Sequence, residues 1–145
     1  MTNRSSESGF TLVEALVAIV ILVFGLIAVT NLMLVAASSN SVANQGTAAA
    51  TIAAQRLEQL KAIPFGDVRL NTGGDVTSDV AGFFSNPDDV VPGVGQIHSR
   101  WEIVSPQAGV LFIRVRSEGT GALSAARSRA EFTTFRTCTS TFLGC

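Results

Sequence analysis

The sequence has few of the side chains that enzymes use for chemistry. Its 145 residues include one histidine, two cysteines and no tyrosine. No phosphate-binding loop, metal-ligand spacing or nucleophile motif occurs in it. The net charge of −1 gives no electrostatic reason to expect a nucleic acid as partner. The composition therefore predicts a chain that is not an enzyme, that holds no cofactor or metal, and that binds no nucleic acid.

The scarce histidine and cysteines form no recognisable site. His98 stands alone in a strand-like stretch, where a structural role is expected. Cys138 and Cys145 lie close together at the C-terminus, and a zinc site would need further ligands beside these two. In an exported protein they could form a disulfide that closes a small loop, because extracytoplasmic compartments are oxidising. Two free thiols in the tail are the alternative.

Charged residues are absent from Ala15 to Gln55. An apolar run overlaps this region, from Gly9 to Ala37, and Glu14 is its single carboxylate. A helix needs about 20 apolar residues to cross a bilayer, so the run is long enough. An ionisable group in such a segment costs roughly 2.5–3.5 kcal/mol or more at the bilayer centre. Glu14 is therefore a candidate functional residue.

The start of the apolar run resembles the class III signal of type IV prepilins. In that family the leader ends in Gly, the mature chain begins with Phe, and Glu is the fifth mature residue; Gly9, Phe10 and Glu14 match this spacing in the sequence GFTLVE. The resemblance implies a leader, residues 1–9, that a prepilin peptidase removes, and N-methylation of Phe10. It also implies that Glu14 serves in subunit assembly and registry, and that the apolar helix stays in the mature protein. A plain membrane anchor is the alternative, but it gives no reason for a carboxylate at this depth.

Residues 10–63 are predicted to form one long helix in two parts. Residues 10–37 are apolar all round, as expected for a segment in lipid or in a helix bundle. Residues 38–64 are amphipathic, because apolar side chains recur at spacings of three and four and so fall on one helical face. Pro64 should end the helix. The apolar face should cover a sheet, and its members are Ala49, Ala53, Leu57, Leu60 and Ile63.

Residues 65–96, here called the acidic segment, differ in composition. They are rich in Gly, Asp, Asn, Ser and Pro and show little periodicity, so we expect a long loop, or a loop with a short strand or turn. An aspartate-rich loop could bind calcium through oxygen ligands, but the spacing of a calcium-binding loop is absent. A solvated loop is therefore expected. The aspartates are Asp67, Asp75, Asp79, Asp88 and Asp89, against Arg69 as the one basic residue.

The last part of the chain, residues 97–145, predicts an antiparallel sheet followed by a tail. Apolar and polar residues alternate in residues 97–105 and 110–118, and a weaker third strand is predicted at residues 129–136. The apolar side of the sheet should cover the helix. The predicted fold is α+β: a long N-terminal helix, half of it transmembrane, packed on a small antiparallel β head. The arginines of the strands are expected to form a solvated face opposite in charge to the acidic segment.

The predicted helix and head also resemble type IV pilins, whose form is a lollipop, and the pseudopilins of type II secretion. Within that group the sequence is most similar to minor pilins of the PilV kind. The resemblance implies a structural subunit, a minor one, of a type IV pilus, with the prepilin peptidase, other pilin subunits and the assembly machinery as partners. The subunit would cross the bacterial inner membrane once, with its head on the periplasmic side, before it enters the filament. The alternatives are a type II secretion pseudopilin, or an adhesin or DNA-uptake module of a competence pilus.

Overall fold

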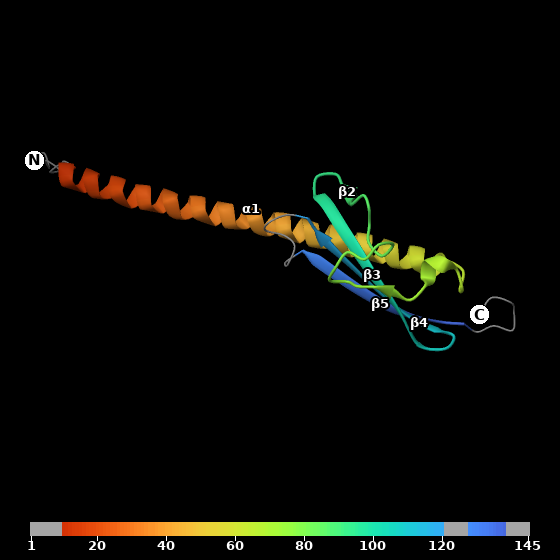
Figure 1. Cartoon of the computed structure of the whole chain (residues 1–145). Helices are drawn as coiled ribbons and strands as arrows, with labels where there is room; N and C mark the ends of the chain where they lie inside the picture. Colours follow the sequence, from red (N-terminus) through yellow and green to blue (C-terminus); the bar gives the residue numbers. More distant parts are fainter. Residues whose placement is uncertain (1–9, 121–127, 139–145) are drawn as a thin grey trace, which may run out of the picture. The chain divides into compact units, whose positions relative to one another are not determined.

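The computed structural model describes residues 10–120 and 128–138. In chain order these residues form the long helix α1, a 3₁₀ turn η1 and the strands β1 to β5 (Figure 1). The chain divides into two compact units, Met1–Ser39 and Asn40–Cys145, and the boundary between them falls within α1.

Helix α1 runs from Leu12 to Ala62, as the sequence predicts. It ends where expected, because Pro64 lacks a backbone N–H and disfavours helical geometry in the residue before it. The guanidinium of Arg136 donates to the carbonyls of Leu60 and Ile63 at 3.2 and 2.9 Å. These bonds supply donors to carbonyls at the helix end and place a positive charge at the negative end of the helix dipole.

Three long strands form an antiparallel meander: β3 (Gly95–Gln107), β4 (Val110–Gly119) and β5 (Arg129–Thr137). All three confirm the predicted strands, and the structure extends each by one or two residues at its ends. Along β4 the residues alternate between buried and half-buried, as a strand with one covered face should. The sheet lies beside the C-terminal part of α1 (Figure 1), so the α+β prediction is confirmed.

The acidic segment takes the second of its two expected forms, a loop that contains short strands and a turn. It contains η1 (Val68–Leu70), β1 (Gly73–Gly74) and β2 (Asp89–Val91). Both strands pair antiparallel with β3, and Phe84 forms an isolated bridge to Arg100 between them. Residues 73–91 thus follow the edge of β3 as an interrupted strand.

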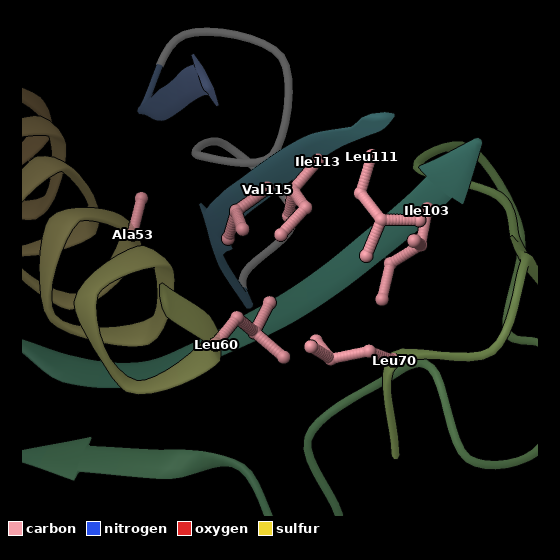
Figure 2. Packing of buried hydrophobic residues seen from close by; sticks show 7 residues of the cluster. All are labelled: Ala53, Leu60, Leu70, Ile103, Leu111, Ile113 and Val115. Carbon is pink, nitrogen blue, oxygen red and sulfur yellow. The ribbon is translucent and has the colours of Figure 1, made fainter. Parts of the chain in front are cut away.

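The hydrophobic core of the second unit lies between α1 and the sheet. Leu60 comes from the helix, Leu70 from η1, and the remaining large side chains from β3 and β4 (Figure 2). Leu57 and Ile63 are partly buried against this cluster, so the predicted apolar face of the helix is the face that packs. The buried members of the cluster are Ala53, Leu60, Leu70, Ile103, Leu111, Ile113 and Val115.

The arginines on the other face of the sheet are paired rather than simply solvated. Arg114 forms ion pairs with Glu102 and with Glu131, on the two flanking strands, and Arg116 pairs with Glu131 at 2.8 Å. The expectation of a solvated face missed this pairing, because the register that brings opposite charges together depends on which strands are neighbours. These half-exposed pairs contribute little stability each but favour the observed register.

We expect Ile113→Ala to lower the free energy of unfolding by about 2–5 kcal/mol, because it leaves a cavity among fully packed neighbours. Ile113 is completely buried in the core. Urea unfolding of the full chain in detergent micelles can be followed by the fluorescence of Trp101, the single tryptophan, which packs against the same core.

Val104→Ala is the matched control for this substitution. Val104 lies on β3 and is 42% exposed, so its truncation should change the free energy of unfolding by less than about 0.5 kcal/mol. Equal losses for the two variants would contradict the observed core.

Candidate functional site

Thr11 caps the first turn of α1. The backbone N–H of Glu14 donates to Thr11 Oγ1 at 3.3 Å, and the N–H of Ala15 donates to the Thr11 carbonyl at 3.2 Å. A threonine followed three residues later by glutamate is the spacing of a capping box. This role of Thr11 was missed at the level of sequence, although the spacing from Thr11 to Glu14 signals it.

Two of the candidate site residues lie at this same helix end. Glu14 is exposed and stands in the first turn, where the positive end of the helix dipole favours a carboxylate by about 0.3–1 kcal/mol. Phe10 precedes the helix and is 73% exposed. Gly9 lies outside the described residues. The N-terminal end of α1 therefore carries three features together: the exposed phenyl ring of Phe10, the turn capped by Thr11 and the exposed carboxylate of Glu14.

The first part of α1 exposes an apolar surface on all sides. Of the described residues, α1 is the one helix long and apolar enough to cross a membrane. None of the apolar stretch is buried within the chain. An exposed apolar surface of this extent requires lipid or other apolar helices around it. Its large members on the helix are Leu12, Val13, Leu16, Val17, Ile19, Val20, Ile21, Leu22, Val23, Phe24, Leu26, Ile27, Val29, Leu32, Met33, Leu34 and Val35, and Phe10 continues it just before the helix.

Glu14 differs from the hydroxyl side chains of the same segment. The Thr30 hydroxyl donates to the Leu26 carbonyl at 2.8 Å, and the Ser38 hydroxyl donates to the Val35 carbonyl at 2.9 Å. Hydroxyl groups can thus be satisfied within their own helix, even in an apolar surrounding. An ionised carboxylate can only accept hydrogen bonds. The carbonyls of its own helix are also acceptors, so they cannot bond to it. Once lipid or other helices surround it, Glu14 therefore needs an N–H donor, either from the free N–H groups of the first turn or from a neighbouring chain.

Asp67 and Asp75 of the acidic segment are engaged in local hydrogen bonds. Asp75 accepts from the N–H and hydroxyl of Thr77 and from the hydroxyl of Ser78, and these bonds lower its pKa. Hydrogen bonds from Arg69 lower the pKa of Asp67 to about 2. Within residues 10–120 and 128–138, no group of three or more His, Cys, Asp or Glu side chains is placed to hold a metal ion.

The predicted disulfide involves a residue that the structure does not describe. Cys138 directly follows β5, and its N–H donates to the carbonyl of Gly109 at 2.8 Å, next to the turn between β3 and β4. Cys145 lies outside the described residues. The bridge between Cys138 and Cys145 stays a prediction.

A groove of about 360 Å³ lies in the second unit beside the end of α1. Arg56 stands over the ring of Trp101, 5.5 Å from its centroid, and pairs with Asp89 at 3.3 Å. The groove thus has an apolar floor and guanidinium groups that are already paired, with no nucleophile beside an acid or base. The lining residues are Arg56, Gln59, Leu60, Ile63, Arg69, Gly82 and Trp101.

Comparison with known families identifies the N-terminal segment. Residues 4–30 match the family model of the prokaryotic N-terminal methylation motif. No curated protein and no solved structure matches the chain. The matched residues include residues 4–9 of the expected leader, Phe10, Glu14 and the first part of α1. The chain therefore carries a type IV prepilin-like class III signal, which supports a pilin-like or pseudopilin protein anchored by its apolar helix.

Proposed function

We propose that the chain is a minor structural subunit of a type IV pilus. In this proposal a prepilin peptidase cleaves after Gly9, the new amine of Phe10 is methylated, and α1 carries the subunit first in the inner membrane and then in the filament. The methylation motif over residues 4–30 is the observation that carries the proposal.

The exposed apolar surface of α1 supports assembly through the helix. A helix that only anchors a protein needs an apolar surface and nothing more. This helix adds a carboxylate, Glu14, at the end next to the motif's glycine–phenylalanine junction. An ionised carboxylate that lipid or other helices surround favours a partner helix that supplies a donor or a positive charge. Assembly with other pilin subunits provides such a partner.

The second unit supports a structural role for the head. Its ionic groups pair with one another across strands, and the groove beside α1 has no arrangement suited to acid–base or nucleophilic chemistry. A small α+β unit of this kind can serve in a filament as a building block or as a tip element.

The test is the composition of filaments sheared from the cell surface. We expect this chain in the sheared fraction, at low abundance relative to the main subunit, with its first peptide beginning at N-methylated Phe10. Peptide mass spectrometry of the purified filaments measures both features. An intact Met1 start in assembled filaments would sink the proposal.

The same fractions, together with deletion of the gene, distinguish a pilus subunit from a pseudopilin of type II secretion. A pseudopilin would remain with the cell envelope, and deletion of its gene would block protein secretion while surface filaments persist. A pilus subunit should leave secretion unchanged and alter the number or length of filaments.

A further inference from the structure

The single histidine of the chain lies between two carboxylates. Nδ1 of His98 is 2.6 Å from Asp88 Oδ1, and Nε2 is 2.9 Å from Asp79 Oδ1. The imidazole side chain is only 12% exposed, and the Phe84 ring lies 5.8 Å from it, centroid to centroid. His98 belongs to β3, whereas both aspartates belong to the acidic segment, so these contacts join two parts of the fold.

The two contacts determine how many protons the ring carries. An ionised carboxylate accepts hydrogen bonds and cannot donate them. Neutral imidazole has one N–H, so it could donate to one of the two aspartates and would face the other with a lone pair. Both contacts are satisfied when both ring nitrogens carry protons. The geometry therefore corresponds to a charged imidazolium.

Charged groups from each neighbouring element surround this ring. Arg100, two residues along β3, donates to Asp79 at 2.6 Å and also pairs with Glu118. Glu118 lies opposite His98 in the register of β4, and Asp89, beside Asp88, pairs with Arg56 of α1. Arg100 opposes a positive charge on His98, while Asp79 and Asp88 favour it.

We propose that His98 is a proton-controlled clamp that holds residues 79–88 on the edge of β3 and releases them when the ring loses a proton. His98 contacts both ends of this stretch, because Asp79 is its first residue and Asp88 is its last. Between them the backbone is held to β3 by hydrogen bonds from Ser85 N–H to the Ser99 carbonyl, at 2.8 Å, and from Trp101 N–H to the Phe83 carbonyl, at 2.9 Å. Release would uncover a strand edge that can pair with another chain.

The direction of the pH effect follows from the ionisation of the partners. Partial burial opposes the charged form of His98, but hydrogen bonds to Asp88 and Asp79 outweigh it and raise the pKa of His98. A raised pKa contributes stability that is complete below the ordinary value of about 6.5 and is lost as pH rises through the raised value. Hydrogen bonds from His98 and Arg100 lower the pKa of Asp79, so its contribution is lost only as pH falls below the ordinary carboxylate range.

The test uses the full chain in detergent micelles with ¹⁵N-labelled histidine. One histidine in the sequence means that its two ring signals need no assignment. We expect a titration midpoint above that of the same chain unfolded in urea, with both ring nitrogens protonated below that midpoint. Asp88→Asn should shift the midpoint down. A midpoint at or below the unfolded value would overturn the proposal.

Hydrogen exchange then tests whether the proton controls the segment. After correction for the intrinsic pH dependence of exchange, protection of residues 79–88 should fall as pH rises through the His98 midpoint, while β4 stays protected. His98→Gln cannot titrate, so its protection in the same residues should be low and independent of pH. Wild-type protection of residues 79–88 that stays constant through the midpoint would overturn the clamp, whatever the variant does. Retained protection of β4 in the variant shows that it is folded.

Discussion

Gly9→Val is expected to leave the chain as an uncleaved precursor that retains residues 1–9. In a peptidase site suited to glycine, a stiff, β-branched side chain would be crowded. Overpacking of a fitted site costs typically about 1–3 kcal/mol. If that cost falls on the transition state, cleavage slows by roughly 5- to 150-fold. Immunoblots of membranes should show a longer chain, and peptide mass spectrometry should find the peptide that crosses the Gly9–Phe10 junction.

Gly25→Val is the matched control, because it makes the same substitution within the apolar run. A side chain at Gly25 meets nothing within 4 Å, and the residue lies well inside α1. We expect normal cleavage of this variant. Gly9→Ala adds one methyl group and should retain more cleavage than Gly9→Val. Normal maturation of Gly9→Val would contradict the assignment of this junction as the cleavage site.

The helix and the three long strands could be predicted because their signals are local. The apolar run and its change to a one-sided pattern near Ala49 set the course of α1, and Pro64 set its end. In β4 the alternation of Leu111, Ile113 and Val115 with arginines gave both the strand and its buried face. Periodicity of two or 3.6 residues reports which side of an element is covered, whatever covers it.

The contacts of His98 and Arg136 could not be predicted, because they depend on distant residues. Arg136 donates to the carbonyl of Leu60 across 76 positions, and nothing near Arg136 in sequence indicates a helix end. His98 contacts Asp79, which lies 19 positions earlier in the sequence, because the acidic segment follows the edge of β3. The acidic segment has almost no hydrophobic periodicity of its own. Its course is set by the edge of β3, which offers backbone hydrogen bonds to a segment with little preference for another structure.

In lipid or among other helices the carboxylate of Glu14 is a buried charge, and a neighbouring subunit can supply a group that pairs with it. Lipid or neighbouring helices must cover the apolar surface around it, and a buried carboxylate needs a donor or a proton. The amine that the proposed cleavage would free at Phe10 is a candidate cation, but on the same chain it would lie about one turn away at the helix end. A neighbouring subunit, shifted along the filament axis, can bring its amine directly to Glu14. We propose that this pair sets the stagger of adjacent subunits, since buried polar pairs are known to fix register.

Glu14→Ala should leave membrane insertion and cleavage intact and strongly reduce incorporation into filaments. Removal of one partner leaves the other charge buried, at a cost of about 3–5 kcal/mol. That cost corresponds to docking that is weaker by roughly two to three and a half orders of magnitude. Glu14→Gln keeps the shape but not the charge, so its incorporation should lie between those of the wild type and Glu14→Ala. Immunoblots of sheared filaments and of membranes, compared for each variant, measure the distribution.

Glu58→Ala separates the loss of a docking charge from the loss of any carboxylate on α1. Glu58 is exposed in the second unit and pairs with Lys61 at 2.7 Å, three residues further along the same helix. An exposed pair of this kind contributes about 0.3–0.5 kcal/mol, so its removal should leave incorporation unchanged. Cleavage after Gly9 should also be normal in both variants, because in this proposal Glu14 acts only after cleavage. Filaments that contain the Glu14→Ala protein at the level of Glu58→Ala would show that the carboxylate does not determine docking.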